Sequence, residues 1–331
     1  MCMNWPDAGS CVRADVRTAI RVAVLILIAY IVYRVLSKSW DDIKVSATAL
    51  RPSWSGLLLA SVCICAGYAV LITAWRLLLR TWRSPLGIFD ASRIWFVSSL
   101  GKYVPGKIWA IGAMAILAKE AGASPVAATG SSIIMQLVNL AAGFAVVSLV
   151  GAGDLLAPYP LLRFASWITL AATVVGLMYG PQLLVWAVRA GTRLVGRPMP
   201  DMPVITRSIL LQVFAANVVA WIAYGIGFGI FWSALLGRGG GISLAALAVY
   251  TASYLVGYMV LPAPGGIGAR ETAMIGLLVS LRLAPPADAA LLATTSRIWL
   301  TVLEILPGLV FLPGTSLRRR TSSSPPDGPV A

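Results

Sequence analysis

The sequence predicts an all-α polytopic membrane protein, and three observations support this prediction. The hydrophobic fraction is 59% and the mean hydropathy +0.85, whereas charged residues make up only 11%. A soluble domain has roughly a quarter of charged residues. Long apolar runs recur along the chain, and two further runs are each interrupted by a Pro-Gly pair. We therefore expect about six full spans and two broken re-entrant helical hairpins in one transmembrane domain, 1–315.

The expected spans follow the apolar runs in chain order, each close to the roughly 20 residues that cross a bilayer as a helix. They cover about 22–36, 54–79, 126–150, 161–179, 209–236 and 287–312. The first run has no small-residue cleavage site, so it is predicted to be a span and not a signal peptide. The Ser- and Pro-rich segment 316–331 is expected to be a disordered cytoplasmic tail.

Basic loops set the expected orientation, because such loops stay in the cytoplasm. One follows the second span, and a second, 182–207, precedes the fifth. With both hairpins returning to the side they came from, the two termini are cytoplasmic as well. Only the loop 37–53 disagrees, because this topology places it outside although it carries Lys38, Lys44 and Arg51.

Composition also bears on partners and chemistry. The net charge is +14, but most basic residues flank apolar spans, which favours anionic lipid head groups over nucleic acid as partners. The chain contains no histidine, the usual general base and commonest metal ligand. Its four cysteines form no Cys-x-x-Cys pair. We expect no metal, no cofactor and no enzymatic activity.

Two broken apolar segments are the most informative stretches. They read SSLGKYVPGKIWA from Ser98 and LVGYMVLPAPGGIGARE from Leu255, within hairpins at about 94–117 and 244–281. Proline removes a backbone donor and glycine lets the chain reverse. In lipid, such a break persists only where protein or a water-filled cavity satisfies the bare backbone groups. Both breaks should therefore line a cavity.

The order of elements is the same in two halves of the chain. Each half has two spans, a hairpin and a span, and the second starts from the opposite face of the membrane. The sequence thus suggests an inverted repeat with halves 19–151 and 160–313.

Basic residues near the breaks are candidates for binding an anion. Lys102 and Lys107 belong to the first hairpin and Arg270 to the second. Backbone N–H groups at a helix start attract anions, so two such ends with these cations would form an anion site. The alternative for both lysines is anchoring at the membrane interface.

Further charges lie in the second half. Glu271 follows Arg270, and Arg297 and Glu304 are two helical turns apart in the last span. A charge in the membrane costs at least about 2.5 to 3.5 kcal/mol, so these groups should face the interior. They either contact the substrate or form a structural salt-bridge cluster. Gln136, Asn139 and Asn217 are expected in interhelical hydrogen bonds. The tryptophans expected in an interfacial belt, with no site role, are Trp75, Trp82, Trp95 and Trp109.

The motifs LGKYVPGKIW and PAPGGIGARE resemble those of the flippase-like transmembrane family named after lysylphosphatidylglycerol synthase. The resemblance covers most of the chain, up to Leu312, and implies a bacterial cytoplasmic-membrane protein that moves a lipid. Full-length synthases carry a further aminoacyl-transferase domain, so a stand-alone membrane domain is expected. Motif and charges together indicate these substrate-binding residues: Gly101, Lys102, Tyr103, Pro105, Gly106, Lys107, Pro264, Gly265, Gly266, Gly268, Arg270, Glu271, Arg297 and Glu304.

The function expected first is translocation of an anionic phospholipid or lipid-linked glycan intermediate, with envelope glycan or lipid biosynthesis enzymes as further partners. One alternative is a membrane glycosyltransferase that uses a polyprenyl-phosphate sugar, with Asp41 and Asp42 as its carboxylates. Another is a scaffold for assembly of envelope polysaccharide. The scaffold alternative predicts that the charges at the breaks are dispensable, whereas activity retained in an Asp41→Asn, Asp42→Asn double variant would argue against the glycosyltransferase.

Overall fold

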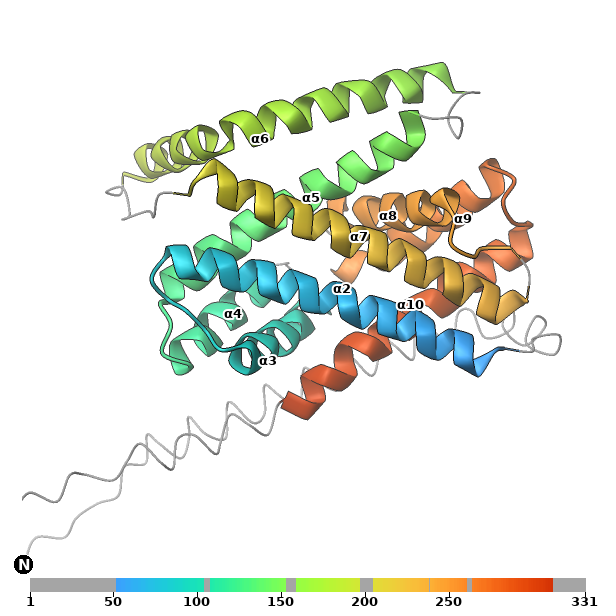
Figure 1. Cartoon of the computed structure of the whole chain (residues 1–331), viewed down its shortest axis with the longest axis horizontal. Helices are drawn as coiled ribbons and strands as arrows, with labels where there is room; N and C mark the ends of the chain where they lie inside the picture. Colours follow the sequence, from blue (N-terminus) through green and yellow to red (C-terminus); the bar gives the residue numbers. More distant parts are fainter. Residues whose placement is uncertain are drawn as a thin grey trace, which may run out of the picture. The chain divides into compact units, whose positions relative to one another are not determined.

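The computed structural model describes residues 52–103, 108–152, 159–196, 205–237, 239–260 and 264–311, all within one compact unit, Leu50–Ala331. The regular structure in these ranges is helical (Figure 1). The elements are α2 (Trp54–Thr81), α3 (Ile88–Ser99), η1 (Leu100–Tyr103), α4 (Ile108–Glu120), α5 (Pro125–Ala152), α6 (Pro160–Val195), α7 (Arg207–Leu236), α8 (Leu244–Met259), η3 (Pro264–Gly266), α9 (Ala269–Ser280) and α10 (Pro286–Phe311). The expected first span and the tail 316–331 lie outside the described residues.

Five helices of the described part are long and apolar enough to cross a membrane: α2, α5, α6, α7 and α10. Four of them agree with the predicted spans to within a few residues. The predicted all-α polytopic membrane fold is confirmed.

The predicted span 161–179 is too short. Instead of a span to residue 179 and then a loop, α6 is one helix of 36 residues. At 1.5 Å per residue this is about 54 Å, well beyond the roughly 30 Å hydrocarbon core. The helix continues through Pro181 and ends where Gly196 takes the left-handed conformation, with φ 64°. The basic residues Arg189 and Arg193 therefore lie on its last turns and not in a loop.

Both predicted hairpins consist of separate helices: η1 ends at Tyr103 and α4 begins at Ile108, and α8 ends at Met259 before η3 and α9. The arms of the two hairpins, α3 with α4 and α8 with α9, have 12, 13, 16 and 12 residues, each too short to cross the bilayer alone. In the second hairpin, Gly265 and Gly266 have φ 58° and 70°, which only glycine adopts readily. A Cβ on Gly266 would lie 2.6 Å from the carbonyl oxygen of Gly257 in α8, so the turn packs directly on its own helix.

The core is centred on α2 and α7, which lie side by side (Figure 1). Trp221, Phe228 and Ile64 are fully buried there. Glycines permit the close approach: a Cβ on Gly227 would lie 3.1 Å from the carbonyl oxygen of Ala60. Small residues at helix contacts are the usual device inside membranes, where packing drives association.

Around this pair, one arm of each hairpin packs against a long helix from the other half of the chain. The first arm of one hairpin, α3, packs against α10, and the first arm of the other, α8, packs against α5. The second arms, α4 and α9, pack against α5 and α10, respectively. Each hairpin thus bridges the two halves of the chain.

Packing at Gly229 offers a test of this core. Its carbonyl accepts a 2.9 Å hydrogen bond from Gly241 N–H, and a Cβ would overlap the Gly241 carbonyl oxygen. We expect Gly229→Ala to lower the free energy of unfolding by about 1–3 kcal/mol. The matched control is Gly176→Ala, where a Cβ meets open space. That change should be neutral or stabilising by up to about 1 kcal/mol. Thermal unfolding of both variants in detergent measures the difference, and equal midpoints would contradict the packing.

Candidate functional site

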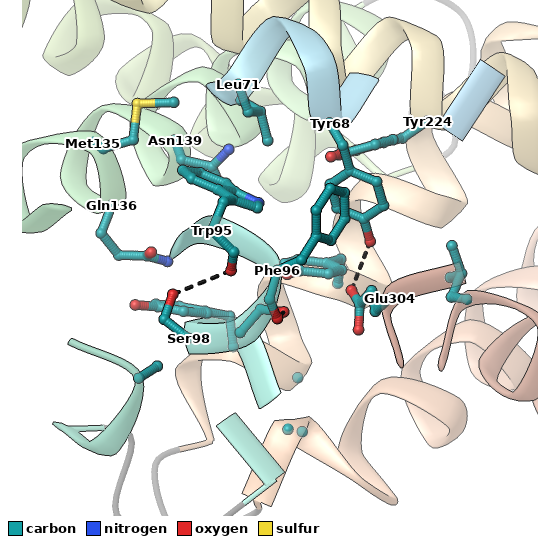
Figure 2. Close-up of a pocket in the computed structure, with 18 of the residues that line it drawn as sticks. Tyr68, Leu71, Trp95, Phe96, Ser98, Met135, Gln136, Asn139, Tyr224 and Glu304 are labelled. Carbon is teal, nitrogen blue, oxygen red and sulfur yellow. Dashed lines mark hydrogen bonds between the residues drawn. The ribbon is translucent and has the colours of Figure 1, made fainter. Parts of the chain in front are cut away.

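A cavity of about 270 Å³ lies where both hairpin breaks meet α2, α5, α7 and α10. The first hairpin contributes Ser98, Ser99, Ala110 and Ile111, and the second contributes Gly257, Tyr258, Gly265, Gly266 and Arg270. Among the described residues, the charged groups in its wall are Arg270, Arg297 and Glu304. Figure 2 shows Tyr68, Tyr224 and Glu304 on one side of the view and Gln136 and Asn139 on the other.

Arg270 is the most deeply buried of these charges. It lies in the first turn of α9 and is only 5% exposed. Its Cζ is 5.0 Å from the ring centroid of Tyr250 and 5.2 Å from that of Tyr254, so the guanidinium contacts two aromatic rings of α8. Its Nη2 atom has no hydrogen-bond partner. Arg270 therefore retains an unsatisfied cationic donor at the cavity.

Arg297, in contrast, has partners within the protein. Its Nη2 donates a 2.7 Å hydrogen bond to the carbonyl of Gly265, and its Nε lies 3.6 Å from Glu271 Oε1. The other oxygen of Glu271 accepts a 2.7 Å hydrogen bond from Gly268 N–H and so caps α9. The 3.6 Å contact is an ion pair and too long for a good hydrogen bond. Arg297 thus ties α10 to the break of the second hairpin.

Glu304 places a carboxylate in the same wall, two turns beyond Arg297. It is 9% exposed, and its Oε1 accepts a 2.7 Å hydrogen bond from the hydroxyl of Tyr68 (Figure 2). Of the salt-bridge cluster that the sequence suggested, the ion pair between Arg297 and Glu271 is present. Glu304 contacts α2 through the hydroxyl of Tyr68.

Tyrosines of the cavity wall were missed by the sequence reasoning. They are Tyr68, Tyr224, Tyr250, Tyr254 and Tyr258. The last three recur every four residues, which places them on one face of α8. This periodicity was the available signal.

The predicted tryptophan belt is wrong for two of its members. Trp95 lines the cavity, and Trp75 is fully buried with its indole N–H donating to Ser131 Oγ at 2.9 Å. The prediction for Asn139 and Asn217 is confirmed, because Asn139 Nδ2 donates to Asn217 Oδ1 at 2.8 Å between α5 and α7.

The predicted site residues fall into groups. Those in the cavity wall are Gly265, Gly266, Arg270, Arg297 and Glu304. Gly268 and Glu271 form the start of α9. Gly101 lets the arms of the first hairpin approach, since its Cβ would lie 2.9 Å from the backbone of Ala110. Lys102 and Tyr103 lie in η1 and Pro264 in η3, with only their backbones described. The predictions for Pro105, Gly106, Lys107, Asp41 and Asp42 lie outside the described residues.

Loss of the Arg297 contacts should destabilise the second hairpin. We expect Arg297→Ala to lower the free energy of unfolding by about 1.5–3 kcal/mol, as for a hydrogen bond to a charged group. Arg297→Lys keeps the charge but cannot direct donors in a planar fork at both Gly265 and Glu271, so it should restore only part of this loss. Thermal unfolding measures the effect, and a lysine variant as stable as wild type would contradict the bracing role.

Residues 19–308, well over half of the chain, match the family model described as the lysylphosphatidylglycerol synthase TM region. No curated protein matches the chain. The family match agrees with the apolar helices that are long enough to span a membrane. This chain belongs to the lysylphosphatidylglycerol synthase transmembrane-region family.

Proposed function

We propose that this protein binds the anionic head group of a lipid between its two hairpin breaks and moves that lipid across a bacterial cytoplasmic membrane. The observation that carries the proposal is Arg270, a buried cation with an unsatisfied donor in a cavity inside the membrane domain. Ionisable groups within membranes are expensive and typically mark a substrate pathway. Arg297, the other cation in the described part of the cavity wall, has protein partners and needs no ligand.

The family supports a role in lipid or envelope metabolism, because its description names an aminoacylated phospholipid. The proposal goes further and assigns translocation of an anionic phospholipid or a lipid-linked glycan intermediate. A cavity of this size accommodates a head group, while the acyl chains stay in the surrounding bilayer.

The proposed movement uses the two halves of the chain as an inverted repeat. The contacts between the halves support this relation, since α3 packs on α10 as α8 packs on α5. In such repeats, the binding site lies near the bilayer midplane and the halves rock around it. Here the hairpins bridge the halves, so rocking would change access to the cavity from either side.

Cysteine labelling tests the inverted arrangement. Glu120, at the end of α4, and Arg282, just after α9, are both exposed and mark the open ends of the two hairpins. In a background with Cys2, Cys11, Cys63 and Cys65 replaced, Glu120→Cys should react with an impermeant maleimide only from the cytoplasmic side. Arg282→Cys should react only from the outside. Labelling of both from one side would exclude the inverted repeat.

Transport assays test the function itself. An anionic lipid with a fluorescent label on its head group is protected from an impermeant quencher while it is in the inner leaflet. In proteoliposomes, the fluorescence of this protected fraction should be quenched faster than in protein-free liposomes. Arg270→Gln should reduce this rate by at least about tenfold, because a desolvated ionic contact to the head group is lost. Arg282→Gln removes an equal charge outside the cavity and should behave as wild type.

Matched size-exclusion profiles and unfolding midpoints are the control for folding in these assays. Equal rates for Arg270→Gln and wild type, or no transport by wild type above empty liposomes, would contradict the proposal and favour the scaffold role.

A further inference from the structure

A groove of about 480 Å³ lies between α2 and α7. At one end of this antiparallel pair the helices are joined, because Ser53 N–H donates a 2.8 Å hydrogen bond to the carbonyl of Ala234. At the other end, where α2 ends and α7 begins, the groove separates them (Figure 1). Its wall consists of Ala69, Val70, Thr73, Ala74, Arg76, Leu77, Arg80, Gln212 and Ala216. No described residue lines both this groove and the cavity between the hairpins, so the two are separate.

The charged and apolar side chains of the groove are separated along α2. Arg80 lies in the last turn of the helix and Arg76 one turn earlier, whereas Ala69 lies about three turns before Arg80. The helix has 28 residues and is about 42 Å long, so its ends extend past the roughly 30 Å hydrocarbon core. The groove therefore runs from the depth of the lipid head groups to the depth of the acyl chains.

The two arginines form a positive pair without a carboxylate beside it. They are four residues apart on one face of α2, where Cβ atoms are about 5–6 Å from each other and like charges repel. Neither α2 nor α7 contains Asp or Glu, and none of the described residues of the groove wall is acidic. A phosphate within reach of both side chains would replace this repulsion with charge-assisted hydrogen bonds.

Hydrogen bonds within the protein orient this wall. Arg76 Nε donates at 3.0 Å to the carbonyl of Leu86, in the loop after α2, and no described residue accepts a hydrogen bond from its two terminal nitrogens. The hydroxyl of Thr73 donates at 2.8 Å to the carbonyl of Ala69 in its own helix. The free donors of α2 are therefore at the end with the arginines, and the deep end is apolar.

We infer that this groove binds an anionic phospholipid of the surrounding bilayer. The phosphate contacts Arg76 and Arg80, and one acyl chain lies along Ala69, Val70 and Ala216. The arginines alone would suit any phosphate, but an apolar wall that continues for about three helical turns suits an acyl chain. Basic pockets between membrane helices bind lipid head groups in this way. The bound lipid fills the open end of the α2–α7 pair, and the inference does not depend on the proposed translocation.

Quenching by brominated lipids tests which lipid occupies the groove. In the full-length, cysteine-replaced background described above, Ala66→Cys carries a bimane label on an exposed position of α2, one turn beyond the apolar end of the groove. The matched control label is Val175→Cys, near the middle of α6 and 52% exposed. Each labelled protein is reconstituted with phosphatidylglycerol or phosphatidylcholine brominated on the acyl chains, and quenching gives their relative binding constants.

The groove should prefer the anionic lipid. At Ala66 we expect phosphatidylglycerol to bind at least about tenfold more tightly than phosphatidylcholine, because each arginine near a membrane surface contributes roughly a fivefold preference. At Val175 the two lipids should bind equally. The same ratio at both labels overturns the inference. A label at Ala66 that neither lipid quenches, while Val175 is quenched, shows that protein covers the groove and also overturns it.

A charge variant tests the head-group end. Arg80→Gln should lower the preference at Ala66 by about fivefold. Arg80 is chosen because Arg76 also holds the loop at Leu86. Arg282→Gln removes an equal charge outside the groove and should leave the preference unchanged. A preference that Arg80→Gln does not alter overturns the assignment of the phosphate to these arginines.

A steric variant tests the acyl-chain end. Ala69→Phe fills the apolar half of the groove and keeps both arginines. Ala69 is exposed, so the variant should unfold at the wild-type midpoint, and Ala69→Leu provides a smaller substitution if it does not. The lipid preference at Ala66 should fall close to the ratio at Val175. A preference retained in a folded variant shows that the arginines attract head groups on the open surface, which overturns binding in the groove.

Discussion

The contact on which the site depends is the hydrogen bond from Arg297 to the carbonyl of Gly265. A helix broken inside a membrane exposes backbone groups that lipid cannot satisfy, and each such group costs several kcal/mol. Arg297 satisfies the carbonyl at the turn, and Glu271 satisfies the N–H of Gly268 where the helix resumes. Because the two side chains also form an ion pair, one unit of α9 and α10 holds both sides of the break.

This bracing explains why neighbouring charges differ in role. Glu271 and Arg297 neutralise each other while fixing the backbone, so neither needs a ligand. Arg270, adjacent to Glu271 in the sequence, packs on the rings of Tyr250 and Tyr254, which stabilise a cation without satisfying all of its donors. The turn places one arginine in a structural network and leaves the other partly free at the cavity.

Much of the fold could be predicted from the sequence, because lipid imposes simple constraints. Apolar length located α2, α5, α7 and α10, and proline with glycine located the second break. The end of α6 was missed, since a proline after glycine suggests a stop although a membrane helix tolerates it. The positions of Glu271 and Tyr224 in the structure could not be predicted from the sequence. A carboxylate after a break can either cap a helix or bind a ligand, and an aromatic ring can face either lipid or a cavity.

Structural residues and candidate ligand-binding residues differ in whether their polar atoms have hydrogen-bond partners in the protein. A buried group placed only for stability should have its partners in the protein. Arg297 donates to the Gly265 carbonyl and Glu271 Oε2 accepts from the Gly268 N–H, while Glu271 Oε1, which accepts no hydrogen bond, has the Arg297 guanidinium 3.6 Å away. The hydroxyl of Tyr224 and the free nitrogen of Arg270 lack such partners, although phenylalanine and a shorter side chain would avoid the cost. Under the proposed function, these two unsatisfied groups lower the stability of the empty protein and would be completed by a bound anion. This is the trade-off expected where function, and not folding, selects the residue.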